Sequence, residues 1–308
     1  MFRSWSPWIT GPLRFLIGAA GLYAVLCAVA FLAQRRLMYF PEREGETEAI
    51  HRALGHGLVP WSDARGRLLG WRRVVRRQAP RMLVLHGNAG DALGREGYLA
   101  VLEAAGFEVV LLEYPGYGPR EGERSEASLV ADARAALRRL REESKTPVFL
   151  LGESLGSGVA VQVAAAERGA VAGLLLTVPF ARMTEVAAQH YPYLPMGLLL
   201  KDRWDSLGAV RGYPGPVAMI VAGRDEVVGA EQGRRLAKGC PGAVRVWEIP
   251  DANHNGLPLL PGRPPWSEAL AFLRSHVQTQ GLGSAQALRG GQRGDVERAS
   301  ASGRSPLS

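Results

Sequence analysis

Residues 148–158 read Val148-Phe149-Leu150-Leu151-Gly152-Glu153-Ser154-Leu155-Gly156-Ser157-Gly158. The apolar run at the start of this segment is typical of a strand that is buried on both faces, and the residues from Leu155 to Ala166 are typical of a helix. Gly152 and Gly156 stand two positions before and after Ser154. A sharp turn from strand to helix requires small residues at these two positions. The segment therefore predicts that Ser154 is held strained and exposed at the edge of a sheet.

Short runs of Val, Leu and Ile alternate with longer amphipathic stretches on both sides of this segment. The alternation is typical of an α/β fold, in which a mostly parallel twisted sheet carries helices on both faces. Strands are expected at 81–85, 108–112, 148–151, 174–177, 217–222 and 244–249, with an antiparallel edge strand at 68–75. Helices are expected at 92–105, 125–143, 155–166, 230–238 and 266–277.

Two polar loops follow later strands and suggest chemistry at Ser154. A serine hydroxyl is a poor nucleophile unless a base accepts its proton and an acid orients that base. Asp225 follows the strand 217–222, and His254 follows the strand 244–249. Both loops leave the carboxyl ends of strands, so both side chains are expected at the same edge as Ser154. Glu226 is the alternative acid, while an ordinary turn residue and a surface histidine are the structural alternatives for Asp225 and His254.

A glycine-containing loop, His86-Gly87-Asn88-Ala89-Gly90, follows the strand 81–85. An acyl-transfer site needs fixed N–H donors for the negative oxygen of its tetrahedral intermediate. We expect these oxyanion-hole donors to be the backbone N–H groups of Asn88 and Leu155. The alternative is a phosphate-binding turn, but this loop matches neither G-x-x-x-x-G-K-[ST] nor a complete G-x-G-x-x-G.

The interval from Pro179 to Gly215 separates two strands by more residues than one helix requires. Such an insertion over the carboxyl ends of strands commonly forms a lid or a substrate pocket, whereas its apolar residues could equally form an extra core helix. Five aromatic residues are expected to line a substrate pocket, four from this interval and one from the loop Glu113–Gly118, which is expected to form a rigid wall of the site. They are Tyr114, Phe180, Tyr191, Tyr193 and Trp204.

The two ends of the chain differ from the part between them. Residues 15–33 are uncharged and long enough to cross a bilayer as one helix, which predicts a membrane anchor at residues 1–40. A cleaved signal peptide is the alternative, with a cleavage-like Ala28-Val29-Ala30. Arginines flank the segment on both sides, so its orientation in the membrane stays open. A globular domain is expected at 41–277, and residues 278–308 have the composition of a disordered tail.

Composition narrows the function classes further. The chain has 308 residues, of which 47% are hydrophobic and 21% charged, and this balance excludes a disordered or fibrous protein. Two cysteines cannot form a disulfide framework, and no Cys/His spacing resembles a zinc site, so no structural metal is expected. A serine nucleophile with its base and acid requires no metal and no organic cofactor for its chemistry. The net charge is +8, but the arginine-rich run 65–81 carries no interleaved aromatic stacking platform and no recognised DNA-binding motif, which disfavours nucleic acid. A solvated face is favoured for that run over attraction to lipid headgroups.

The chain resembles the α/β-hydrolase superfamily, and within it the Bem-like, membrane-anchored α/β-hydrolase-domain proteins, over roughly residues 34–277. The matching segments are Gln34–Pro41, Leu85–Gly90, Tyr114–Gly118, Gly152–Gly158, Asp202–Ser206, Gly223–Val227 and Asn253–Asn255. The resemblance implies an α/β-hydrolase fold with Ser154 as nucleophile, Asp225 as acid and His254 as base. Two positions depart from the family pattern, because Ala252 replaces the usual glycine and Asp91 stands where relatives often have asparagine.

These observations predict a membrane-anchored serine hydrolase that cleaves carboxylic ester or thioester bonds, with an acyl ester or a lipid as substrate. Two alternatives remain. One is a non-catalytic scaffold of the same fold that binds a lipid or a protein, and the other is a serine peptidase. The sequence indicates neither the acyl-chain length nor the oligomeric state.

Overall fold

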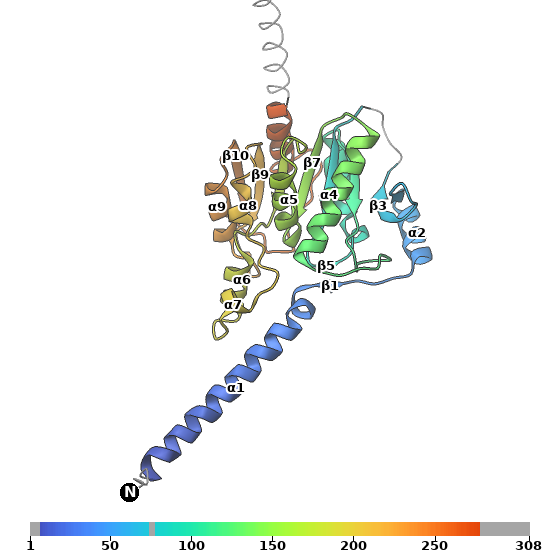
Figure 1. Cartoon of the computed structure of the whole chain (residues 1–308). Coiled ribbons are helices and arrows are strands. Elements are labelled where there is room, and N and C mark those ends of the chain that lie inside the picture. The colour runs from blue at the N-terminus through green and yellow to red at the C-terminus, as the bar shows by residue number, and fades with distance from the viewer. Residues whose placement is uncertain (1–6, 74–77, 278–308) are drawn as a thin grey trace, which may run out of the picture.

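The computed structural model describes residues 7–73 and 78–277, so the expected disordered tail at 278–308 lies outside the described residues. Its centre is an eight-stranded sheet with the strand order β10-β9-β8-β7-β4-β6-β3-β2 (Figure 1). The strands of this sheet are β2 (Val59–Ser62), β3 (Leu68–Arg72), β4 (Arg81–Leu85), β6 (Glu108–Leu112), β7 (Val148–Glu153), β8 (Leu174–Thr177), β9 (Val217–Ala222) and β10 (Val244–Ile249). Strands β10, β9, β8, β7, β4 and β6 are parallel to one another. Strand β3 pairs antiparallel with β6 on one side and with β2 on the other. The expected α/β architecture is confirmed.

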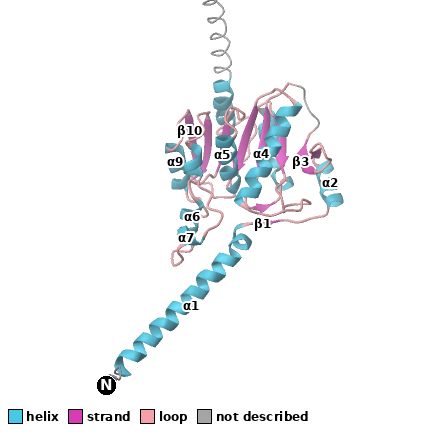
Figure 2. Ribbon diagram, in the orientation of Figure 1, coloured by secondary structure: helices cyan, strands magenta, loops and turns pink. Residues whose placement is uncertain are grey.

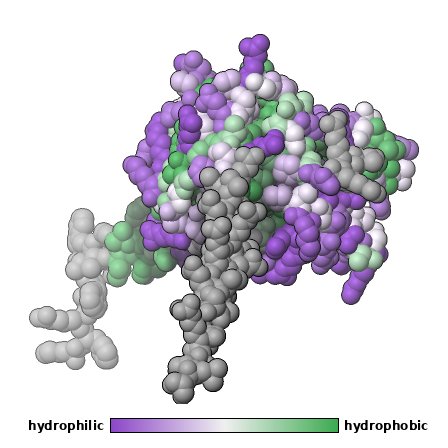
Figure 3. All heavy atoms as spheres, turned by 90° about the horizontal axis from the view of Figure 1, so that it is seen from above, coloured by the Kyte–Doolittle hydropathy of each residue, from purple (hydrophilic) through white to green (hydrophobic). Residues whose placement is uncertain are grey.

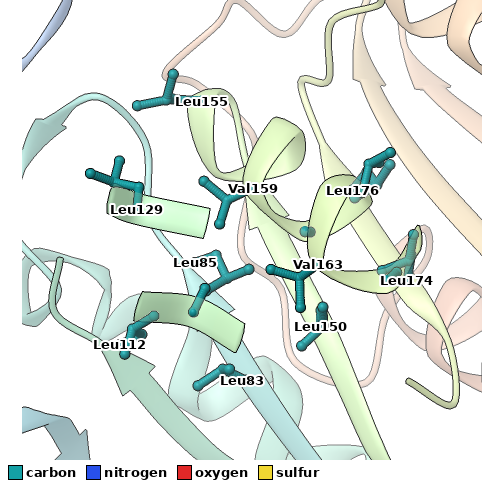
Figure 4. Packing of buried hydrophobic residues seen from close by; sticks show 14 of the residues in the cluster. Leu83, Leu85, Leu112, Leu129, Leu150, Leu155, Val159, Val163, Leu174 and Leu176 are labelled. Atoms are coloured by element: carbon teal, nitrogen blue, oxygen red, sulfur yellow. The ribbon is translucent and has the colours of Figure 1, made fainter. Parts of the chain in front are cut away.

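Helices cover both faces of the sheet (Figure 2). They are α2 (Glu46–Gly55), α3 (Gly97–Ala104), α4 (Glu126–Glu143), α5 (Leu155–Ala166), α6 (Met183–His190), α7 (Met196–Leu199), α8 (Ser206–Val210), α9 (Ala230–Lys238) and a helix at residues 266–277. Alternate residues of β4 enter the two core layers. Leu83 and Leu85 pack in the layer that contains α4 and α5 (Figure 4), whereas Met82 and Val84 pack in the layer that contains α3 and the 266–277 helix. A strand that is apolar at every position therefore serves two cores.

Four of the expected helices are found with nearly the expected bounds, namely α4, α5, α9 and the 266–277 helix. Helix α4 begins after Ser125, whose side chain accepts a hydrogen bond from the backbone N–H of Ser128 at 3.2 Å, as an N-cap residue does. The expected helix at 92–105 is interrupted. A short 3-10 turn, η1 (Leu93–Arg95), precedes α3, and glycines at 94 and 97 weaken the helix at this point.

The expectation that the segment at 68–75 forms the sheet edge is wrong. Strand β3 lies between β6 and β2, and β2 forms the edge instead. Strand β2 contains Pro60, which cannot donate to a ladder and is tolerated on an edge strand. A further two-stranded sheet joins β1 (Phe40–Pro41) in parallel to β5 (Ala89–Gly90).

The insertion at 179–215 combines the two structures that were expected as alternatives. Helix α8 packs against α5 and α9 and so extends the core. Helices α6 and α7 project from the carboxyl edge of the sheet toward the N-terminal helix (Figure 1). We refer to residues 183–200, which contain α6 and α7, as the lid.

The N-terminal helix α1 (Pro7–Met38) extends away from the domain (Figure 1). Its segment Leu13–Met38 is long and apolar enough to cross a membrane, and the most apolar window of that segment is 0% buried. The face opposite α1 is mostly hydrophilic where it is described (Figure 3). Several residues of the arginine-rich run form ion pairs at the amino ends of the parallel strands, as in Arg72–Glu143 and Arg81–Glu108. These arginines therefore lie at the opposite edge of the sheet from α1.

Candidate active site

Ser154 occupies a strained turn between β7 and α5. Its backbone has φ 51° and ψ −115°, a conformation that L-residues rarely adopt. The turn brings backbones into close contact at both flanking glycines. A Cβ on Gly156 would collide with the carbonyl oxygen of Leu85, and a Cβ on Gly152 would lie 2.7 Å from the Cα of Ser157. The spacing of the two glycines thus has the steric cause that the sequence suggested.

The structure brings Ser154, His254 and Asp225 together into one hydrogen-bonded chain. His254 Nε2 lies 3.0 Å from Ser154 Oγ, and His254 Nδ1 lies 2.8 Å from Asp225 Oδ2. Asp225 is in the turn after β9, and His254 is in the loop after β10. The His254 side chain is 8% exposed, so it is shielded from bulk water while it faces the serine hydroxyl.

The carboxylate of Asp225 is held ionised by its surroundings. Its Oδ1 accepts the backbone N–H groups of Val228 at 2.8 Å and Val227 at 3.0 Å. Burial acts to raise the pKa of Asp225, but the hydrogen bonds from His254 and from these backbone groups outweigh it and lower the pKa below its ordinary value. Glu226, the alternative acid, instead accepts a weak bond from the backbone N–H of His254 at 3.4 Å.

The loop at 86–90 lies beside Ser154. Asn88 and Leu155 line the same cavity as Ser154, where oxyanion-hole donors were expected. Three bonds fix the position of Asn88. Its carbonyl oxygen accepts from Phe40 N–H and Tyr117 Oη, both at 2.9 Å, and its side-chain amide donates to the Met38 carbonyl at 3.0 Å. The pairing of β1 with β5 therefore ties this loop to the end of α1.

Sequence reasoning missed a group of residues that supports the Ser154 turn. Glu153 accepts hydrogen bonds from Arg95 Nη2 at 2.7 Å and from Tyr98 Oη at 3.0 Å. Burial acts to raise the pKa of Glu153, but the charge and hydrogen bonds of Arg95, helped by Tyr98, lower it below its ordinary value. These contacts join β7 to η1 and α3. The signal was present, because Glu153 is a charged residue directly beside Ser154.

Asp91, which departs from the family pattern, has a structural role here. Its side chain is almost fully buried and forms an ion pair with Arg52 of α2. It also accepts a hydrogen bond from the backbone N–H of Gly94 at 2.8 Å. The carboxylate thus fastens α2 to the turn that follows β5.

A cavity of about 220 Å³ opens at Ser154. Its lining is Ala30, Gln34, Leu37, Met38, Asn88, Ser154, Leu155, Phe180, Met183, Val186, Ala187, His190, Tyr191, Leu194, Met196, Leu200, Val227 and Val228. Most of these side chains are apolar. No carboxylate lines the cavity among the residues that the structure describes. Within residues 7–73 and 78–277, no group of three or more His, Cys, Asp or Glu side chains could hold a metal ion.

Three of the five expected pocket residues lie elsewhere, and those expectations are corrected. Tyr114 and Trp204 are fully buried in the core, where Tyr114 packs against the ring of His86 at 4.2 Å between centroids. Tyr193 is 86% exposed at the end of the lid. Phe180 and Tyr191 do line the cavity. The sequence shows that these residues are aromatic, but it does not show which way their side chains point.

Known proteins resemble this chain in sequence and in fold. The family model described as serine aminopeptidase, S33, matches residues 77–202. An uncharacterized protein of Mycobacterium tuberculosis is 37% identical over 237 residues, which cover 75% of this chain and 83% of that protein. The chain belongs to the α/β-hydrolase superfamily.

Two more distant relatives of this α/β-hydrolase have established names. The lysophosphatidylserine lipase ABHD12 of Xenopus tropicalis is 31% identical over 221 residues, covering 59% of this chain and 57% of that protein. Protein bem46 of Schizosaccharomyces pombe is 29% identical over 184 residues, covering 57% of this chain and 62% of that protein. These relatives agree with the Bem-like resemblance seen in the sequence.

Solved structures agree on the fold. An esterase from Pyrococcus furiosus superposes with a TM-score of 0.57 at 17% identity, covering 71% of this chain and 92% of that chain. The likeness at this identity concerns the fold alone. The family match and the sequence relatives support hydrolase activity for this chain.

Proposed function

We propose that the protein is a membrane-anchored serine hydrolase that cleaves the ester or thioester bond of an acyl substrate through an acyl-enzyme intermediate. The observation that carries the proposal is that Ser154, His254 and Asp225 are linked by hydrogen bonds beside an apolar cavity. In this proposal residues 1–40 anchor the enzyme, and residues 41–277 form the hydrolase domain.

In the acylation step, Ser154 Oγ attacks the acyl carbonyl carbon while His254 Nε2 accepts the hydroxyl proton. The separation of 3.0 Å between these atoms is suited to that transfer. Asp225 is bonded to Nδ1, so it holds the tautomer that leaves Nε2 free to accept a proton and stabilises the imidazolium that forms. The backbone N–H groups of Asn88 and Leu155 stabilise the negative oxygen, at about 3 kcal/mol per donor.

The tetrahedral intermediate collapses when its bond to the leaving oxygen or sulfur breaks and His254 returns the proton to that atom. The acyl group then remains on Ser154. Water attacks the acyl carbon with His254 again accepting a proton, and collapse of the second intermediate releases the carboxylic acid and restores the Ser154 hydroxyl.

The lining of the cavity favours an acyl ester over a peptide. A peptidase that recognises a free amino terminus needs an anionic group to bind that ammonium. No carboxylate lines the cavity among the residues that the structure describes, whereas aliphatic side chains surround Ser154. A hydrocarbon chain gains about 0.8 kcal/mol per buried methylene in such a site.

Activity-based labelling tests the proposal. The full-length protein in detergent is treated with a fluorophosphonate probe and assayed with p-nitrophenyl acyl esters and matched anilides. We expect labelling and ester hydrolysis in the wild type, and loss of labelling together with at least about a 10⁴-fold fall in kcat for Ser154→Ala. Ser267→Ala in the 266–277 helix is the matched control and keeps both activities. Labelling that persists in Ser154→Ala contradicts the proposal, and faster anilide hydrolysis favours a peptidase. A folded wild type that neither labels nor turns over supports the scaffold alternative.

A further inference from the structure

The wall of the cavity beside Ser154 includes the last turns of α1. Ala30, Gln34, Leu37 and Met38 line the cavity from that helix, and the lid lines it from the other side. Resting on the proposed function, we propose that the cavity opens toward the bilayer between α1 and the lid, so that a membrane-resident acyl lipid enters it sideways from the leaflet. The anchor helix then forms part of the acyl-binding site.

The contact between α1 and the lid is specific and buried. Gln34 is 7% exposed, although it belongs to a helix that otherwise extends away from the domain. Its amide donates to the carbonyl of Leu199 at 3.1 Å and accepts from the backbone N–H of Lys201 at 2.7 Å. A helix that served only as a tether would need no buried amide facing the lid.

The uncharged parts of the two segments end at the same level. In α1 the run without charge ends at Gln34, and in the lid the run at 191–200 ends before Lys201. The charged residues that follow join each other, because Arg35 Nε bonds Asp202 at 3.0 Å. Lys201 Nζ lies 4.2 Å from the centre of the Phe31 ring. Arg35, Asp202 and Lys201 mark one level, and we place the membrane surface at this level on both segments.

The far end of the lid lies beside the apolar part of α1. Tyr23 Oη donates to the backbone carbonyl of Tyr193 at 2.8 Å. Tyr23 precedes Gln34 by 11 residues, about 16 Å along the helix axis. In the same part of the lid, Tyr193 is 86% exposed and Leu198 is 85% exposed. Exposed apolar surface of this kind is costly in water but favourable in lipid.

The rim of the cavity lies at this boundary. Leu37 of α1 is 55% exposed and Tyr191 of the lid is 48% exposed, and both also line the cavity. A lipid whose chain enters between them brings its ester, which lies near the membrane surface, toward Ser154 without first leaving the bilayer. The substrate class is therefore an acyl ester lipid with its chain in the leaflet.

Substitution on opposite faces of α1 tests the entrance. The full-length protein is reconstituted in phosphatidylcholine vesicles, and kcat/KM is measured for p-nitrophenyl acetate in solution and for 1-oleoylglycerol in the bilayer. Ala30→Trp places a large ring in the wall of the cavity. We expect it to lower the ratio of long-chain to short-chain kcat/KM at least 10-fold. The control is Ala28→Trp, an exposed position on the opposite face of the same helix, which leaves that ratio unchanged.

The outcomes separate this inference from the proposed function. If the wild type is active and Ala30→Trp leaves the ratio of long-chain to short-chain kcat/KM unchanged, the proposed entrance is overturned and the proposed serine hydrolase activity stands. An equal fall of the ratio in Ala28→Trp also overturns it, because the effect then does not depend on the face of the helix. A wild type that cleaves neither ester and does not react with fluorophosphonate overturns the proposed function and the entrance together.

A second measurement does not depend on activity. In a background of Cys27→Ala and Cys240→Ala, a fluorescent probe is attached at Leu198→Cys or, as control, at Ser267→Cys in vesicles that contain a lipid-borne quencher. Quenching at position 198 but not at 267 supports insertion of the lid into the leaflet. Equal fluorescence at both positions overturns it.

Discussion

At the scale of single residues, the geometry at Ser154 depends on two positions without side chains. We expect Gly156→Ala to destabilise the fold by about 2 kcal/mol or more, because its Cβ would collide with backbone atoms of Leu85 and His86. The control is Gly55→Ala in α2, where a Cβ meets nothing within 4 Å and the change is neutral or stabilising by about 0.5 kcal/mol. Urea unfolding of the detergent-solubilised protein measures both. Equal stability of the two variants contradicts the steric explanation.

Asp225→Asn removes the charge that supports His254 while it preserves the shape of the side chain. We expect kcat for ester hydrolysis to fall by about 10⁴-fold, because the amide favours the wrong imidazole tautomer. The pKa of Asp225 is lowered in the folded protein, so its stabilising effect is present above its unfolded pKa of about 3.9 and is lost as the pH falls through the folded pKa.

The stability to unfolding, measured between pH 3 and pH 8, therefore checks the direction of the Asp225 pKa shift without relying on catalytic turnover. The wild type is expected to be more stable than Asp225→Asn above about pH 4, with the difference shrinking in acid. A difference that grows as the pH falls would contradict it.

Sequence and structure agree best where chemistry demands specific residue types. Ser154, Asp225 and His254 could be selected because each follows a strand and their order along the chain is constrained. The pocket residues could not, because a side chain's direction depends on tertiary packing. Trp204 shows this, since its backbone has φ 43° and its ring is buried. Gln34 could not be placed at the cavity for the same reason.

At the scale of secondary-structure elements, the pair of Glu153 and Arg95 joins the end of β7 to η1. Arg95→Met leaves Glu153 without its main partner, and we expect a loss of about 3 kcal/mol at neutral pH. The pKa of Glu153 is lowered in the folded wild type, so its stabilising effect is fully present above its unfolded pKa of about 4.3 and is lost as the pH falls through the folded pKa. The loss of stability in Arg95→Met is therefore expected to shrink below about pH 4.

The double variant Arg95→Met with Glu153→Gln is the control, since it removes the unpaired charge and is expected to recover part of the lost stability. Chemical unfolding at pH 3 and pH 7 compares the three proteins. A double variant that is less stable than Arg95→Met would show that Glu153 does not need Arg95.

Elements with continuous apolar runs could be predicted, and elements held by single contacts could not. Strands β4, β6 and β9 are buried at every position, which the runs of Val, Leu and Ile indicated. Strand β2 carries Pro60, which argues against a strand unless the sheet edge is known. Strands β1 and β5 have two residues each, too few for any periodicity.

At the scale of the whole molecule, the fate of the N-terminal segment separates an anchor from a signal peptide. We expect α1 to be retained, because Gln34 bonds Leu199 of the lid and Arg35 bonds Asp202, and cleavage after Ala30 would remove most of the helix that holds these two residues in place. Mass spectrometry of the protein purified from membranes, after an alkaline carbonate wash, measures this. A soluble product that begins at Phe31 would contradict the anchor.

The hydrogen bonds of Gln34, Arg35 and Asn88 hold α1 and the hydrolase domain in one relative orientation. If α1 spans a bilayer, the heading of the domain relative to the lipids is fixed before any ligand arrives. The search for a ligand then becomes diffusion in two dimensions, and each encounter occurs in the same orientation. Part of the entropy of association is thereby lost when the protein inserts, and not at each turnover.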